Sequence, residues 1–168
     1  MSLPTAEDVL RTIEATLENV IKPGLSNVPE RSAAATIGHL LRHVRVRLAA
    51  EGQILTDDIA ALRALLPRVQ RFLDEAGQQR DAGLIAAALA DAADAPGYAS
   101  LTALGARACR LRGALQSGLA ALQALRPAFG EDHTYLALRA AIRDYMAMQI
   151  EAERCLIEPA FLGFGPRR

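Results

Sequence analysis

The chain has 168 residues, of which 51% are hydrophobic and 23% charged, a balance typical of a globular protein rather than a disordered one. Its formal net charge is +0, aromatic residues make up 4%, and tryptophan is absent. Nucleic-acid binding normally uses a basic surface, and single strands also need aromatic stacking platforms. We therefore expect neither nucleic acid nor an anionic membrane as a partner.

The sequence also predicts the compartment of the protein. The N-terminus lacks the basic and apolar regions of a signal peptide, and no apolar run reaches the roughly 18–20 residues that span a bilayer. Two isolated cysteines, Cys109 and Cys155, do not form a disulfide framework. Lys22 is the only lysine beside many arginines, which indicates a GC-rich coding bias. We expect a soluble protein of a bacterial-type reducing cytoplasm.

Two amphipathic helices are predicted in the first third of the chain, over 5–21 and from Pro29 to Gly52. Thr5 can cap the first helix, with Asp8 placed close to the position that completes a capping box. Pro23 and Gly24 stop this helix. The apolar stripes expected to face the core are Val9, Ile13, Leu17 and Val20 in the first helix, and Ile37, Leu40, Leu41, Val44 and Leu48 in the second.

Further helices follow with the same periodicity, over 56–77, 80–93, 100–125 and 131–157. Pro67 lies inside the third helix and is expected to kink or split it, because proline lacks a backbone donor. Gly105, Gly113 and Gly118 in the fifth helix indicate close approach of a neighbouring helix. Pro159 is expected to end the sixth helix.

The pattern as a whole predicts an all-α fold. We expect residues 1–168 to form a single domain, an antiparallel bundle of about six helices, four long and two shorter, with an apolar C-terminal tail over 159–168. No period-2 run typical of a strand occurs.

One candidate ligand site lies on the second helix. His39 and His43 are four residues apart and share a face, as the histidines of HExxH helices do, but residue 40 is leucine and no third ligand occurs at a recognisable spacing. We therefore predict no metal, no cofactor and no catalytic residue. Together with Arg42 and Arg47 the histidines could hold a phosphate or carboxylate. The alternative is an ordinary solvated helix face.

A candidate interface lies at the C-terminal end. The sixth helix is apolar on more than one side, and a helix of this kind is either central in a bundle or at a subunit contact. The soft apolar side chains that predict an interface are Met146, Met148, Ile150, Phe161 and Phe164.

The first third of the chain carries a family resemblance. The residues involved are Pro4-Thr5-Ala6-Glu7-Asp8-Val9-Leu10, Glu18-Asn19-Val20-Ile21-Lys22-Pro23, Arg31-Ser32-Ala33-Ala34-Ala35, Leu40, Leu41, Arg47 and Leu48. They resemble a small, mostly bacterial all-helical family of unknown function, whose members accompany aminoglycoside-phosphotransferase-like and acyl-CoA-dehydrogenase-like proteins. Where that family tends to have asparagine in its second helix, this chain has Thr36 or Gly38. The resemblance implies no catalytic residue.

These observations favour a helical interaction or accessory module that binds another protein or itself, in the latter case as a homo-oligomer such as a dimer. The alternative is a bundle that binds a small ligand or anion through the His39, His43, Arg42 and Arg47 face. An enzyme is the third possibility.

Overall fold

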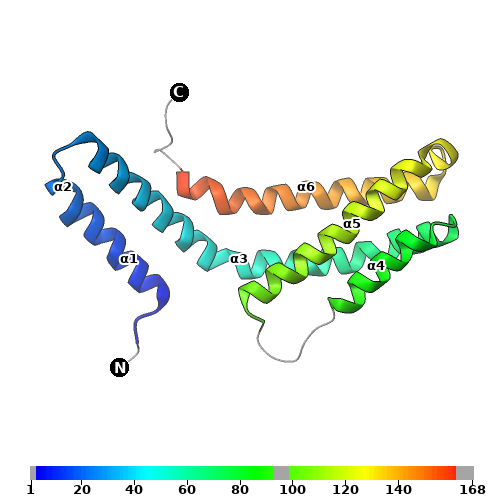
Figure 1. Ribbon diagram of the computed structural model, residues 1–168, viewed down its shortest axis with the longest axis horizontal. Helices are drawn as coiled ribbons and strands as arrows, with labels where there is room; N and C mark the ends of the chain where they lie inside the picture. The colour runs from blue at the N-terminus through cyan, green and yellow to red at the C-terminus, as the bar shows by residue number, and fades with distance from the viewer. Residues whose placement is uncertain (1–2, 93–98, 162–168) are drawn as a thin grey trace. The chain divides into compact units, whose positions relative to one another are not determined.

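Residues 3–92 and 99–161 are described by the computed structural model, with the backbone alone at Cys155 and at 158–161. Within these ranges the chain is helical and contains no strand, which confirms the all-α fold (Figure 1). None of the helices described combines the length and apolar character that crossing a bilayer requires. The predicted C-terminal tail falls outside the described residues from 162 onward.

The helices are named as in Figure 1. Their bounds are α1 Ala6–Thr16, a π-helical segment Leu17–Ile21, α2 Lys22–Gly24, α3 Val28–Glu75, α4 Gln79–Asp91, α5 Leu101–Phe129 and α6 His133–Phe161. The first three follow one another without a gap and correspond to the helix predicted over 5–21. Pro23 and Gly24 end this run, as predicted.

The start of α1 has the predicted capping box. The Thr5 hydroxyl oxygen accepts a hydrogen bond from the backbone N–H of Asp8 at 3.2 Å, and an Asp8 carboxylate oxygen accepts one from the Thr5 N–H at 3.0 Å. These two bonds satisfy backbone donors that the first helical turn leaves without partners. Hydrogen bonds that the Asp8 carboxylate accepts from the Thr5 hydroxyl, at 2.6 Å, and from the Thr5 backbone N–H lower the pKa of this carboxyl.

A single helix, α3, stands where two were predicted. It runs for 48 residues through Gly52 and Pro67, so the predicted end at Gly52 and the predicted split at Pro67 are wrong. Glycine inside a helix costs only about 1 kcal/mol, which neighbouring turns can offset. The side chains that flank Pro67 on the core side are fully buried, and their packing stabilises the helix on both sides of it: Leu62, Leu66, Val69 and Leu73. The helix predicted to end at Pro159 likewise continues, to Phe161.

The chain divides into two compact units. One comprises Met1–Gly52 and Glu151–Arg168, and we call it the hairpin unit because α1 runs antiparallel to the first half of α3 (Figure 1). The other comprises Gln53–Ile150, and we call it the four-helix unit. Helices α3 and α6 contribute to both. The single domain expected from the sequence stays a prediction.

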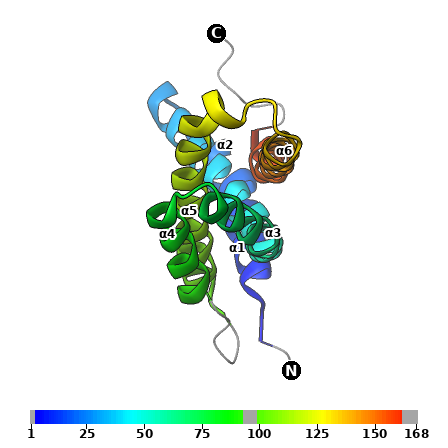
Figure 2. The ribbon, with the colours of Figure 1, turned by 90° about the vertical axis from the view of Figure 1, so that its right-hand side faces the viewer.

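The four-helix unit holds the main core. Its α4 lies beside α5 in both views (Figure 1 and Figure 2). Gly118 of α5 marks the closest approach: a Cβ atom there would lie 2.9 Å from Val69 Cγ1 and 3.1 Å from Ile85 Cδ1. Close approach of a neighbouring helix, which the sequence predicted at these glycines, is thus confirmed at Gly118. The prediction is wrong at Gly105 and Gly113, where an added Cβ would meet nothing within 4 Å.

Candidate functional site

A polar seam joins the two helices of the hairpin unit. Arg45 of α3 donates to Glu14 of α1 at 2.6 Å, and a second nitrogen of the same guanidinium lies 3.9 Å from Glu7. The Glu14 side chain is only 16% exposed, so this pair is more shielded from water than an ordinary surface ion pair. The seam fixes the register of α1 on α3.

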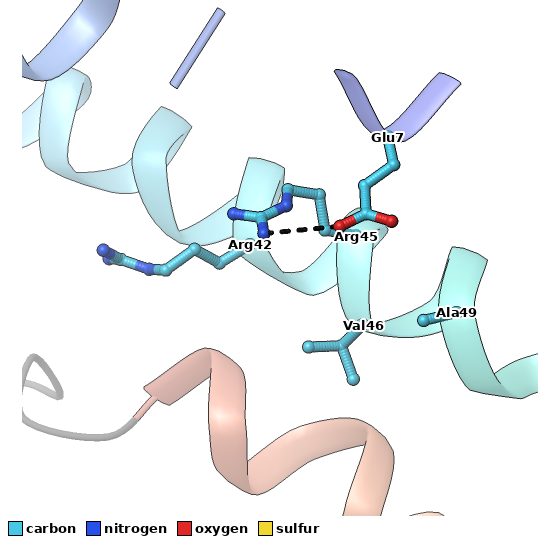
Figure 3. A pocket seen from close by; sticks show the side chains of 5 residues that line it. All are labelled: Glu7, Arg42, Arg45, Val46 and Ala49. Carbon is cyan, nitrogen blue, oxygen red and sulfur yellow. Dashed lines mark ion pairs between the residues drawn. The ribbon is translucent and has the colours of Figure 1, made fainter. Parts of the chain in front are cut away.

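A small pocket opens beside this seam (Figure 3). Its volume is about 300 Å³, and it is lined by Glu7, Arg42, Arg45, Val46 and Ala49. Glu7 reaches over from α1, while the other four side chains come from successive turns of α3 (Figure 3). The carboxylates of Glu7 and Glu14 offset the charge of Arg45, which weakens the pocket as an anion site.

The four residues of the predicted ligand face have different surroundings. Arg42 lies with one guanidinium nitrogen 3.1 Å from Nδ1 of His39, so these two side chains come together. Arg47 instead donates two hydrogen bonds to Glu51, at 3.0 and 2.5 Å. The same hydrogen bonding lowers the pKa of the Glu51 carboxyl. Nδ1 of His43 is buried and has no hydrogen-bond partner.

No group of three or more His, Cys, Asp or Glu side chains that could hold a metal ion occurs in residues 3–92 and 99–161.

The predicted interface residues of α6 are exposed where they are described. Met146 and Met148 are each 46% exposed and Ile150 is 67% exposed. Met148 borders a shallow groove of about 290 Å³ between α3 and α6, and Ala61 and Ala64 are among the residues that line it. The side chain of Phe161 and all of Phe164 lie outside the described residues.

The apolar stripes predicted to face the core of the first two helices do not do so. Most of their side chains are between 44% and 69% exposed: Val9, Ile13, Val20, Ile37, Leu40, Val44 and Leu48. We call these seven side chains the hairpin face. The prediction was correct for Leu17, which is buried, and wrong for the seven.

Small residues explain why the stripes are displaced. Leu17 of the π-helical segment and Ala34 and Gly38 of α3 are buried, and an added Cβ at Gly38 would lie 3.7 Å from Leu17 and 3.3 Å from Glu18. The backbones therefore approach along a line of small residues and ion pairs. A narrow contact of this kind leaves the larger aliphatic side chains beside it and not within it.

Both stripes of the hairpin face lie on the same side of the hairpin. Each residue advances by about 100° around an α-helix, so Val9 and Ile13 are rotated by about a quarter turn from the contact line of α1. Val44 and Leu48 are rotated by a similar angle in the same sense about α3. Because the two helices are antiparallel, equal rotations in one sense bring both stripes to one side. Glu7 and Val46 are rotated in the opposite sense, so the pocket opens on the other side.

The four-helix unit contains a buried polar network. Asp58 of α3 is 1% exposed, and its two carboxylate oxygens accept hydrogen bonds from Tyr145 of α6 at 2.8 Å and from Arg112 of α5 at 2.9 Å. Burial, followed by the hydrogen bond to Asp58, raises the pKa of the Tyr145 hydroxyl. A buried carboxylate with partners on both oxygens stabilises one packing of three helices.

Sequence reasoning missed this network. Asp58 falls in the first turn of the helix predicted over 56–77, where acidic residues are common. The position of Asp58 in the sequence indicates that its side chain is buried, because Asp58 precedes Leu62 by four residues and falls on the same apolar stripe as Leu65 and Val69. A carboxylate on an apolar stripe needs a partner from another helix.

Comparisons with protein-family models, with curated proteins and with solved structures found no match for this chain. The resemblance of the first third to a bacterial helical family stays a prediction.

Proposed function

We propose that this protein is a helical interaction module and that the hairpin face is its binding surface. The observation that supports the proposal is the exposure of seven valine, isoleucine and leucine side chains on one side of a two-helix hairpin. An isolated exposed leucine is ordinary, whereas a contiguous apolar patch on a protein surface is typical of an interaction site.

The energetics favour a protein partner. Full burial of one such side chain contributes about 1.5–3 kcal/mol, so covering the half that each still exposes contributes roughly 1 kcal/mol a residue. Several of these contributions together can offset the entropy lost on association. The partner surface must be apolar and ridged, as the side of a helix or helix pair is.

The charges of the hairpin favour a protein over a lipid surface. Helices that lie on membranes carry unpaired Lys and Arg beside their apolar face. Here four basic residues of the hairpin are ion-paired within the chain: Arg11 with Glu7, Lys22 with Glu18, Arg45 with Glu14 and Arg47 with Glu51.

Site-specific photo-crosslinking in cells tests the proposal. A photoreactive amino acid placed at Ile13 or Val44 is expected to give discrete protein adducts, identified by mass spectrometry. The same probe at Ala15 or Ser32, which are exposed and point away from the hairpin face on the same helices, is the matched control. The adducts are expected to vanish when Leu40→Glu is added. Equal labelling at all four positions would contradict the proposal.

A second candidate function is binding of a small anion in the pocket of Figure 3. The observation that favours it is a buried nitrogen without a hydrogen-bond partner on a residue that lines the pocket, Nε of Arg45. Isothermal titration with inorganic phosphate and with citrate tests it. Binding that is lost in Arg42→Gln and kept in Arg31→Gln would support this function, and the absence of heat at millimolar anion would exclude it.

A further inference from the structure

We infer that the hairpin face binds a second copy of itself, so that two hairpins related by a two-fold axis form a four-helix bundle. This inference rests on the proposed function and names the partner. The face belongs to a pair of antiparallel helices, and such a pair is half of a four-helix bundle.

The distribution of charge on the hairpin favours a second copy as the partner. Between the stripes, over residues 9–20 and 37–48, the same side of the two helices carries Thr16 and Leu41 and no charged residue, and Glu51 with its partner Arg47 lies at one end of this surface. An uncharged surface fits its own copy, because a two-fold axis places identical side chains against one another. The ion pairs Arg11–Glu7 and Arg47–Glu51 neutralise charges of the hairpin within one chain. A different partner chosen by charge would need unbalanced charges at this rim.

The exposed side chains of the hairpin face are spaced as in helices that pack against one another. On α3 the exposed residues Ile37, Leu40, Val44 and Leu48 follow one another at intervals of three and four, and on α1 Val9 and Ile13 are four apart. Side chains at these intervals form the ridges that interdigitate when helices pack at the shallow angles of a bundle. Two such faces can therefore interlock along the length of the hairpin.

The exposed apolar area of the hairpin face also favours a second copy as the partner. Seven aliphatic side chains that are about half exposed present roughly 600 Å² of apolar surface, which exceeds the few hundred Å² common on monomers. A stable interface buries about 800 Å² on each partner. The hairpin face supplies roughly three quarters of that area, so a second copy that also covers some flanking residues can bury it without another chain.

Light scattering on the full chain at tens of micromolar tests the inference. The expected mass is twice the 18.0 kDa of one chain. The variant Leu40→Glu/Val44→Glu is expected to have half the mass of the dimer while it keeps its helical circular dichroism. The control Ser32→Glu is expected to remain a dimer, because Ser32 is exposed and lies about 120° around α3 from Val44. A dimer that persists in Leu40→Glu/Val44→Glu and dissociates in Met146→Glu/Ile150→Glu would place the interface on α6 and overturn the inference.

Cysteine labelling separates failure of this inference from failure of the proposed function. In a Cys109→Ser/Cys155→Ser background, Val44→Cys is expected to react with maleimide at least tenfold more slowly than Ser32→Cys, and the difference is expected to shrink on dilution. A monomer in which both positions react equally fast would overturn self-association and leave the face open to another protein. A monomer in which Val44→Cys is protected would overturn both proposals, because the chain itself would then cover the face.

Discussion

The hydroxyl of Tyr145 donates a 2.8 Å hydrogen bond to Asp58, a carboxylate that is almost completely buried and lies 87 positions earlier in the chain. The bond joins α6 to α3 inside the four-helix unit. The other carboxylate oxygen accepts from Arg112, so α5 is joined at the same point.

Removing the Tyr145 hydroxyl is expected to destabilise the protein. Tyr145→Phe leaves one oxygen of a buried carboxylate without its partner, at a cost of about 1–3 kcal/mol in the free energy of unfolding. Tyr135→Phe is the matched control, because its hydroxyl is also buried but donates at 3.1 Å to the backbone carbonyl of Leu122, a neutral acceptor. Denaturant titration of both variants checks the prediction. Equal losses would show that Asp58 does not depend on Tyr145.

Burial of the Tyr145 hydroxyl, together with this hydrogen bond, predicts a loss of stability at alkaline pH. The pKa of Tyr145 is raised above its ordinary value of 10.0 in the folded protein. Above about pH 10 the unfolded chain releases this proton while the folded chain retains it, so the free energy of unfolding falls as pH rises. Urea titrations across this range are expected to show a shallower decline in Tyr145→Phe. If the stability of the parent protein and of Tyr145→Phe falls equally with pH, Tyr145 does not contribute to the alkaline loss and the prediction is wrong.

Two glycines of α5 form a matched pair. At Gly118 an added methyl group would meet Val69 and Ile85, both fully buried, so Gly118→Ala is expected to cost about 1–3 kcal/mol through overpacking. Gly113→Ala adds its methyl group in open space and is expected to stabilise the helix by up to about 1 kcal/mol. Thermal melts of both variants are the measurement. Stabilisation by Gly118→Ala would show that α3, α4 and α5 pack more loosely than described.

The histidines of α3 are expected to hold no structural metal. Nδ1 of His39 lies against the guanidinium of Arg42, a cation that disfavours a second cation at that nitrogen. Elemental analysis of the purified protein is expected to show no stoichiometric zinc, iron or nickel, and His39→Ala/His43→Ala is expected to melt close to the parent. Bound metal lost in that variant would reverse this reading.

The sequence predicted those features of the fold that depend on neighbouring residues. Thr5 and Asp8 form the capping box that their spacing indicated, and Pro23 and Gly24 end the first helical run. Gly52 and Pro67 did not act as breaks, since burial of the side chains around Pro67 stabilises α3 through it. Intrinsic propensity is a local quantity, and packing with distant residues overrides it.

The candidate site was harder to predict for a different reason. Periodicity showed correctly that Val9 and Val44 belong to apolar stripes, but it does not tell whether the chain itself covers a stripe. That depends on which positions make the contact between helices, and here Ala34 and Gly38 make it because small residues let the backbones approach. The partners of Asp58 lie on two other helices, so spacing within one helix could not identify them.

Hydrogen–deuterium exchange of the full chain at two concentrations tests the central claim most directly. If the hairpin face binds a second copy, amides of residues 6–24 and 28–52 are expected to exchange more slowly at tens of micromolar than after a hundredfold dilution. Amides of α4 and α5 are expected to exchange at the same rate at both concentrations. Exchange in residues 6–24 and 28–52 that does not change with concentration, or a change confined to α6, would contradict the account.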